Sequence, residues 1–290
     1  MSRPTSLRMH DPVNDISWAE WVKSGRWKES ADAIPMLPSL AHEVAEIALN
    51  PDIPAIRVTG IVSKDPVLAT AVIQLANSAA SASAVEVTSI NQAVVRMGTS
   101  AVRGIVTAAC LTSMMADPKI YGSRGRELID HSIGTAYLGR LVADGCGGNG
   151  DEAFLCGLLH DIGKLLILKL ASEPHRGVVK PAPAEVDALI EAEHANFGGL
   201  LVKRWQLPST LEDPIVWHHE PTRAERRPRE AVIMYVANRL AHHYAFGCAR
   251  AEVDIEAEPL FATVGIDAAA LARFDERAPG LFEIARKITP

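Results

Sequence analysis

The 290-residue sequence predicts an all-α protein. Apolar residues recur at a period of about 3.6 along most of the chain, the spacing that places them on one face of a helix. Sustained alternation of apolar and polar residues, which is typical of strands, is nearly absent. Apolar residues make up 48% of the chain, enough for a core that needs no disulfides. We therefore expect helices throughout.

Composition and charge exclude several classes of protein. The formal net charge is −6, which does not favour a nucleic-acid-coating or membrane-surface protein. The N-terminus lacks an apolar stretch of signal-peptide length, and no segment approaches the roughly 20 apolar residues that span a bilayer. The four cysteines lack CxxC spacing and lie in apolar surroundings, as reduced thiols do: Cys110, Cys146, Cys156 and Cys248. We expect a cytoplasmic protein with neither membrane nor nucleic-acid partners.

Residues 1–30 are predicted to be an N-terminal extension with one amphipathic helix. Trp18 and Trp21 are three residues apart, on one helical face, and Trp27 follows. We expect this face to pack on the body of the protein, in preference to docking on another subunit.

Residues 31–120 are predicted to form an N-terminal helical bundle. One helix ends at the breaker around Pro51, and Pro66 suits the first turn of another helix. Thr88 or Ser89 is expected to cap a further helix.

Residues 121–247 are predicted to form a second helical unit, followed by a helical tail at 248–290. The predicted helices span residues 125–145, 151–171 (one helix or a pair), 185–205, 211–219 and 230–246, with a last helix near 267–274.

Several residues of metal-ligating type recur in this second unit: Glu127, His131, His160, Asp161, His194, His218 and His219. The spacing of four between Glu127 and His131 places both on one face of a helix. His160 and Asp161 lie in the apolar run LLHDIGKLL, where an ionisable pair is costly to bury without a metal, a charge partner or a hydrogen-bond network. Imidazole and carboxylate ligands suit divalent Fe, Mn or Zn.

Four segments resemble the HD superfamily in their order and approximate spacing: HSIGTAYLGRL, AFLCGLLHDIGKLLIL, EAEHANFGGLLVKRWQLP and WHHEP. The preceding segments LPSL, KDPVLATAVIQLANSA and TSINQAVVRMG resemble the N-terminal half of the HDOD family, the HD-related output domain. This resemblance implies an all-α fold in which an HD-like helical core packs against an N-terminal helical bundle.

The resemblance also implies roles for single residues. Catalytic HD enzymes use a first His, a His-Asp doublet and a later Asp to hold a divalent metal that activates water against a phosphoester. His131, His160 and Asp161 match the first three positions, and Lys164 matches a phosphate-contacting Lys. Asn238 stands where the later Asp is expected, and its neutral amide is a weaker ligand that supplies no charge.

The cyclic-dinucleotide-cleaving HD-GYP branch adds ligands that match Glu127, His194, His218 and His219. After these residues, however, the chain reads PTRAERRPRE and lacks the Asp-Gly-x-Gly-Tyr-Pro loop that names the branch. The sequence therefore gives little support to cyclic di-GMP hydrolysis.

Three interpretations of the His131, His160 and Asp161 cluster stay open: a hydrogen-bonded core without metal, a bound metal without turnover, and a working phosphohydrolase site. Lys164 is either a solvated residue at a helix end or a phosphate contact. His242 and its neighbour His243 are expected on the surface, because adjacent helical residues diverge by about 100° and no carboxylate stands beside them.

We expect a non-catalytic HDOD signalling regulator that binds protein partners or a nucleotide. The alternative is a metal-dependent phosphohydrolase or phosphodiesterase acting on a nucleotide or another phosphoester. The missing Asp and the missing loop favour the regulator, and the four matches to the HD-GYP ligands favour the enzyme.

Overall fold

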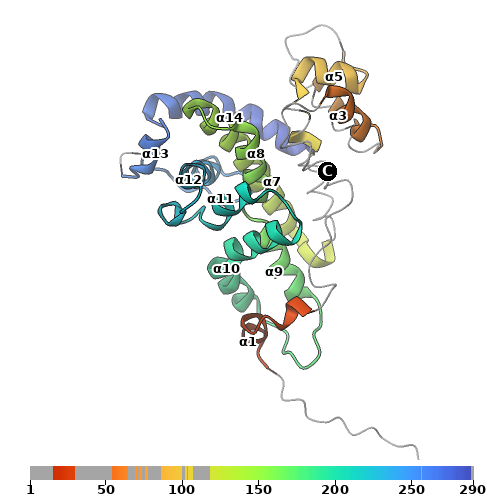
Figure 1. Cartoon of the computed structure of the whole chain (residues 1–290), viewed down its shortest axis with the longest axis vertical. Coiled ribbons are helices and arrows are strands. Elements are labelled where there is room, and N and C mark those ends of the chain that lie inside the picture. The colour runs from red at the N-terminus through yellow and green to blue at the C-terminus, as the bar shows by residue number, and fades with distance from the viewer. Residues whose placement is uncertain are drawn as a thin grey trace, which may run out of the picture.

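The computed structural model describes residues 16–29, 54–64, 86–99, 118–255 and 257–288, with scattered positions between 69 and 77 and between 102 and 106. Within these ranges the regular structure is helical, apart from one isolated β-bridge between Ile16 and Val178 (Figure 1). The prediction of an all-α fold is confirmed. The elements are α1 (Trp18–Lys23), η1 (Arg26–Glu29), α3 (Ala55–Val62), α5 (Ile90–Met97), α7 (Pro118–Cys146), α8 (Gly150–Leu159), α9 (Ile162–Ser172), α10 (Pro183–Arg204), η2 (Ser209–Leu211), α11 (Glu212–Val216), η3 (Pro221–Arg223), α12 (Pro228–His243), α13 (Leu260–Thr263) and α14 (Ala268–Ile288).

The helices α7 to α12 form the body that carries the candidate site. Helix α7 packs along α8 and α12, while α9 packs along α10. The apolar run predicted as one helix or a pair is a pair, α8 and α9, and both are buried over most of their surface. A helix that is apolar on all sides must be enclosed by its neighbours. The break between the pair falls at His160 and Asp161, so the doublet lies at a buried corner.

Local sequence signals explain where these helices begin and bend. The Asn149 side chain accepts hydrogen bonds from the backbone N–H groups of Asp151 and Glu152, and this cap starts α8. Pro183 opens α10, where a missing N–H costs nothing. Helix α7 is kinked at Gly122, whose φ of 53° favours glycine.

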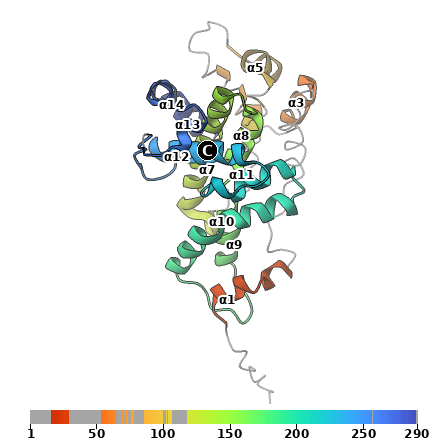
Figure 2. The same cartoon turned by 60° about the vertical axis from the view of Figure 1, so that its left-hand side comes forward.

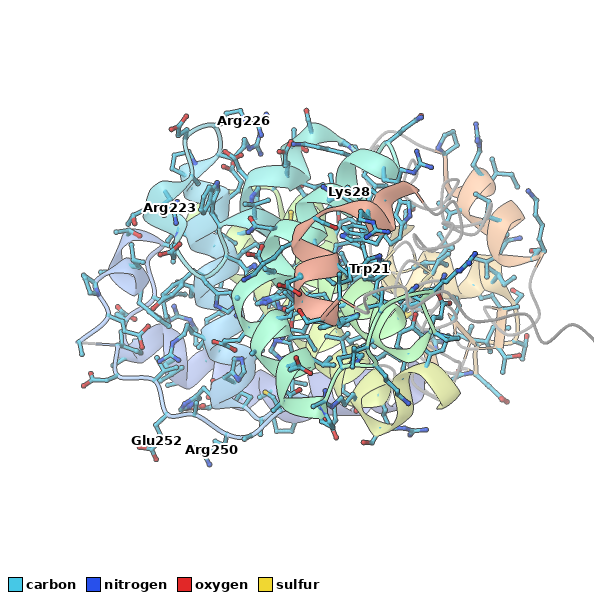
Figure 3. All side chains as sticks on the ribbon, turned by 90° about the horizontal axis from the view of Figure 1, so that it is seen from below. Trp21, Lys28, Arg223, Arg226, Arg250 and Glu252 are labelled. Carbon is cyan, nitrogen blue, oxygen red and sulfur yellow. The ribbon has the colours of Figure 1, made fainter. Side chains whose placement is uncertain are left out.

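The N-terminal segment packs on the body, as its tryptophans predict. The Ser17 and Glu20 side chains form a capping box that starts α1, and Trp18 is buried. The Trp21 ring stacks on His175 with ring centroids 4.0 Å apart, and η1 adds further stacked aromatic contact to α10. Figures 1 and 2 both show α1 at the end of the body formed by α9 and α10. Figure 3 views this end, with Trp21 labelled.

Helices α3 and α5 contact each other and lie at the opposite end from α1 (Figure 2). Ser89 caps α5 by accepting a hydrogen bond from the Gln92 backbone N–H. Of the two predicted caps, Thr88 and Ser89, the structure has Ser89. The Asn77 side chain exchanges two hydrogen bonds with the Val87 backbone, which ties the preceding chain to this helix. The predicted breaks at Pro51 and Pro66 lie outside the described residues.

The tail packs back onto the body through α13 and α14. The predicted last helix is longer than expected, because α14 continues to Ile288 and contacts α7. The Tyr244 hydroxyl donates to Asp275 at 2.9 Å, and this bond joins the end of α12 to α14. Among the described residues, no helix combines the length and apolar character that a membrane span requires. The described cysteines Cys146, Cys156 and Cys248 are free thiols, as expected, and Cys110 lies outside the described residues.

Candidate metal centre

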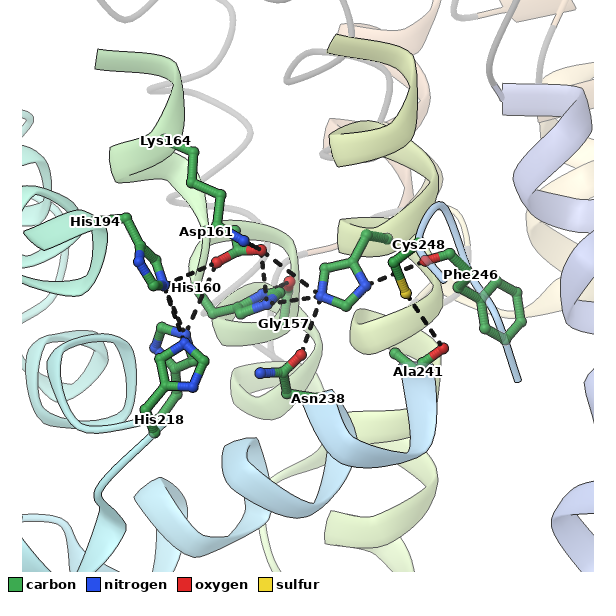
Figure 4. A network of polar contacts seen from close by, with 12 residues as sticks. Gly157, His160, Asp161, Lys164, His194, His218, Asn238, Ala241, Phe246 and Cys248 are labelled. Carbon is green, nitrogen blue, oxygen red and sulfur yellow. Dashed lines mark hydrogen bonds and ion pairs between the residues drawn. The ribbon is translucent and has the colours of Figure 1, made fainter. Parts of the chain in front are cut away.

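One buried cluster brings together side chains from five separate parts of the second unit (Figure 4). Its members are His131 on α7, His160 and Asp161 between α8 and α9, Lys164 on α9, His194 on α10, His218 and His219 after α11, and Asn238 on α12. Most of these side chains are almost fully buried, and the cluster is therefore part of the core rather than of the surface.

Glycines let the backbones approach closely enough to form this cluster. A Cβ atom added at Gly163 would lie 1.9 Å from the His194 backbone oxygen, where α9 crosses α10. A Cβ atom added at Gly157 would lie 2.5 Å from the Ala136 Cα, where α8 crosses α7. These two close crossings set the distance of Asp161 from the histidines on α10 and α7.

Backbone carbonyls fix the orientation of four imidazoles. Each Nδ1 atom faces a carbonyl oxygen: His131 faces Phe246 at 3.2 Å, His160 faces Gly157 at 2.8 Å, His194 faces Ile190 at 2.6 Å and His218 faces Ile215 at 2.7 Å. Because a carbonyl only accepts, we assign the N–H of each neutral ring to Nδ1. The Nε2 atoms are then bare lone pairs, and this is how metal-binding histidines are held by their outer hydrogen bonds.

The bare nitrogens face one another and Asp161 in two lobes. In the first lobe, the His131 and His160 Nε2 atoms are 3.3 Å apart and lie 3.6 and 3.4 Å from Asp161 Oδ2. In the second lobe, the His194 and His218 Nε2 atoms are also 3.3 Å apart and lie 3.3 and 3.8 Å from Asp161 Oδ1. The His219 Nε2 atom completes the second lobe, 3.1 Å from that of His194.

The cluster contains acceptors that have no donor. Asp161 Oδ1 is buried and has no hydrogen-bond partner among the described residues. In the first lobe, the Asn238 Oδ1 atom lies 3.0 Å from the His131 Nε2 atom. An amide oxygen thus joins the imidazole nitrogens and the Asp161 carboxylate as an acceptor in this lobe. Facing lone pairs at such distances repel unless a cation lies between them. The donor set therefore fits one divalent ion in each lobe, with Asp161 between them.

Burial favours the neutral form of His131, His160 and His218, which is the state that binds a metal. Burial lowers the pKa of His131 to about 4 and that of His160 to about 3, and it holds the pKa of His218 well below its ordinary value. Burial also works to raise the pKa of Asp161, but His160 and the Lys164 ammonium hold it well below its ordinary value. Asp161 is thus an anion beside the neutral rings of His131, His160 and His218.

A cleft of about 250 Å³ reaches the first lobe from the surface. Its lining includes Arg124, Glu127, His131, Asp161, Lys164, Asp187, His242 and Cys248. The Lys164 Nζ atom donates to Asp161 Oδ2 at 2.6 Å, so this side chain is part of the cluster rather than a purely solvated residue. Glu127 lies on the cleft wall but in none of the groups of clustered ligand atoms formed by the described residues.

The expectation that His242 lies on the surface is wrong. Its ring centroid is 4.9 Å from that of His131, and its side chain lines the cleft with Cys248. Asn238 and His242 are four residues apart on α12, which places both on the face toward His131. This spacing of four could have predicted that His242 shares a helix face with Asn238. No periodicity could have predicted the position of Cys248, because a turn after α12 brings it back to the cleft.

Comparisons with known proteins agree with this architecture. The chain matches an HDOD domain protein of Geobacter sulfurreducens with a TM-score of 0.72 and 21% identity, over 93% of this chain and 96% of that one. It matches the "Putative phosphohydrolase" of Shewanella amazonensis SB2B with a TM-score of 0.69 and 25% identity, over 90% and 97% of the two chains.

Ribonuclease Y of Thermus thermophilus is 32% identical over 103 residues, which are 36% of this chain and 14% of that enzyme. The chain spans less than two fifths of the length of the first curated relatives that it matches. The model of the HDOD domain matches residues 34–221, more than half of the sequence. The chain belongs to the HDOD domain family.

Proposed function

We propose that this protein is a signalling regulator whose His/Asp cluster binds divalent metal ions and recognises an anionic group without hydrolysing it. The observation that carries the proposal is that four imidazoles each turn Nδ1 to a backbone carbonyl and Nε2 towards the buried carboxylate of Asp161. A hydrogen-bonded core without metal would place a donor between these atoms, and the tautomers assigned above leave none there.

The residues in each lobe indicate what each ion would contact. His131, His160 and Asp161 would hold one ion, with the Asn238 amide oxygen beside them. His194, His218 and His219 would hold the other. Imidazole-rich sites with a carboxylate suit Fe²⁺, Mn²⁺ or Zn²⁺. A bound ion of this kind supplies a Lewis acid for the oxygen of an anionic ligand.

Charge favours binding over turnover. Asp161 is the single carboxylate in the two lobes, and the Lys164 ammonium offsets it. With two divalent ions the centre would be strongly positive, which would hold an anion tightly and slow the release of a phosphate product. The cleft volume of about 250 Å³ is smaller than pockets that enclose whole nucleotides, so the ligand we expect is a single phosphoryl or carboxylate group presented by a partner.

A second candidate function is a metal-dependent phosphohydrolase. Lys164 favours it, because this ammonium lies beside the centre and on the cleft wall, where it would contact a phosphoryl oxygen. The similarity to ribonuclease Y and to the Shewanella protein also supports this candidate.

Metal content and turnover should be measured on the same preparation. We expect freshly purified protein, or protein reloaded with Mn²⁺, Fe²⁺ or Zn²⁺, to carry metal by elemental analysis. We expect it to bind inorganic phosphate by calorimetry and to leave bis(p-nitrophenyl) phosphate and p-nitrophenyl phosphate uncleaved. Asp161→Asn should lose the metal, whereas Asp213→Asn, a buried carboxylate paired with Arg226 outside the cluster, should keep it. Cleavage that Asp161→Asn abolishes would establish the phosphohydrolase instead, and absence of metal under all loading conditions would refute both functions.

A further inference from the structure

A second group of ligand-type side chains adjoins the first lobe on the side away from Lys164. It consists of His131, His242 and Cys248, and one ligand atom from each lies within 4.8 Å of the other two. Figure 4 shows Cys248 beside Phe246, across the network from Lys164 and His194. Cys248 and His242 belong to neither lobe of the histidine centre.

The fold holds Cys248 in place through a tightly packed turn. Gly247 has a φ of 57°, and a Cβ atom there would lie 2.0 Å from the Glu127 backbone oxygen and 2.6 Å from the His131 backbone nitrogen. Phe246 anchors the turn because its side chain is almost fully buried. The turn is thus pressed against α7. The Cys248 side chain that follows it lines the cleft, and its thiol lies 4.0 Å from the Ala241 carbonyl oxygen, to which it donates.

The ligand types define the kind of ion. A tetrahedral zinc site has Zn–N distances of about 2.0–2.1 Å and Zn–S distances of about 2.3 Å, so its ligand atoms lie roughly 3.3–3.6 Å apart. The three ligand atoms lie within 4.8 Å of one another, so side-chain rotations would have to bring them closer together around an ion. Thiolate with imidazole favours Zn²⁺ or Co²⁺ over Mg²⁺ or Mn²⁺. Three protein ligands would leave a fourth coordination position, and Glu127 lines the cleft that the three ligands also line.

We propose that His131, His242 and Cys248 form a thiolate-containing site for a thiophilic divalent cation, with an open coordination position that faces the cleft. The site goes beyond the proposed function and shares only His131 with it. Because the Nδ1 atom of this ring donates to the Phe246 carbonyl, its one free lone pair, on Nε2, would bind either this ion or the first-lobe ion, but not both at once. An ion there would place a Lewis acid on the same cleft wall that the two-lobed centre reaches, which would make the cleft responsive to zinc.

Cobalt is the probe that separates this site from the histidine lobes. Co²⁺ bound by a thiolate produces a sulfur-to-metal charge-transfer band in the near ultraviolet, and Co²⁺ bound by imidazole and carboxylate alone does not. We expect this band in the full-length protein, and we expect Cys248→Ser and His242→Gln to remove it. Cys146→Ser is the matched control, because Cys146 is also a partly buried free thiol and lies outside the group.

Alkylation of the thiols gives an independent readout. We expect bound Co²⁺ or Zn²⁺ to slow iodoacetamide labelling of Cys248 at least about tenfold, measured by peptide mass spectrometry, because a coordinated thiolate is a poor nucleophile. Labelling of Cys146 should not change. Co²⁺ binding without the band, and with unchanged labelling of Cys248, would overturn this site and leave the histidine centre intact. Retention of the band in His242→Gln would overturn the three-ligand assignment, and failure to bind Co²⁺ at all would overturn this site together with the proposed centre.

Discussion

The Nε2 atoms of His194 and His218 lie 3.3 Å apart, although the Nδ1 atom of each already faces a backbone carbonyl. Neither ring, when neutral, has a proton to place between these nitrogens. A cation converts this repulsive contact into two bonds, so the folded state should bind a divalent metal far better than the unfolded chain does. Metal and stability are therefore linked.

Metal binding should raise stability measurably. An ion that binds only the folded state contributes about 2.7 kcal/mol when its free concentration is 100 times the Kd. We expect Mn²⁺ or Zn²⁺ to raise the Tm of metal-stripped protein and a chelator to reverse the rise, as measured by differential scanning calorimetry. Asp161→Asn should abolish the response, and Asp213→Asn should retain it from a lower starting Tm. A Tm that does not depend on metal in the wild type would contradict this linkage.

The metal-free protein should lose stability as the pH falls from about 6.5 towards 4. Burial lowers the pKa of His131 to about 4 and that of His160 to about 3, whereas in the unfolded chain both titrate near 6.5. Between these values the unfolded state binds more protons, so stability is present above pH 6.5 and decreases on acidification. Each histidine contributes a slope of about 1.4 kcal/mol per pH unit in this window.

Urea denaturation of metal-free protein at several pH values between 7 and 5 measures this slope. His160→Gln should reduce the slope by the share of one histidine, about 1.4 kcal/mol per pH unit. His175→Gln, which changes a ring stacked on Trp21 outside the cluster, should leave it unchanged. A free energy of unfolding that stays constant over this range would show that the cluster histidines are already protonated in the folded state.

Asn238→Asp should restore the missing charge of the first lobe. The amide oxygen lies 3.0 Å from the His131 Nε2 atom, so a carboxylate oxygen there would reach the same ion. We expect Mn²⁺ to bind about 10–100-fold more tightly, measured by calorimetry, and we expect cleavage of bis(p-nitrophenyl) phosphate to appear. Asn91→Asp adds the same charge on the exposed face of α5 and should change neither quantity. Weaker Mn²⁺ binding by Asn238→Asp would show that the amide does not face the ion.

The sequence predicted the helical content because periodicity is a local signal. The residues that the structure brings together around Asp161 were expected from their chemical type and, for His194, His218 and His219, from the family resemblance. The apolar run with one His-Asp pair in it predicted a buried doublet, and the structure places that doublet at the corner between α8 and α9. Helix boundaries such as the Ser89 cap also follow from short-range chemistry. What distinguishes a metal centre from a hydrogen-bonded core is the direction of each Nδ1 atom, which depends on carbonyls such as that of Phe246, 115 residues from His131.

The cleft was harder to predict because a turn builds it. The proposed boundary between the second unit and the tail, at residue 247, falls inside the turn that supplies Phe246 and Cys248. Periodicity separates helices from loops, but it carries no information about where a loop returns. The surface prediction for His242 was wrong because it compared this residue with its neighbour His243. The spacing of four between Asn238 and His242 is what places them on the same face of α12.

Gly163→Ala should separate the two halves of the centre. The added Cβ atom would lie 1.9 Å from the His194 backbone oxygen and 2.6 Å from the Gly198 backbone nitrogen, and backbone atoms at a helix crossing cannot move aside singly. Helix α10 must then shift away from α9, which carries His194 away from Asp161. We expect a loss of stability of about 2–3 kcal/mol in urea denaturation and a loss of the second-lobe ion in elemental analysis. Gly145→Ala, whose Cβ atom would meet nothing within 4 Å, should be neutral or stabilising by up to about 1 kcal/mol. A Gly163→Ala protein with wild-type stability and full metal content would mean that α9 and α10 are not in close contact, and the second lobe would then lose its physical basis.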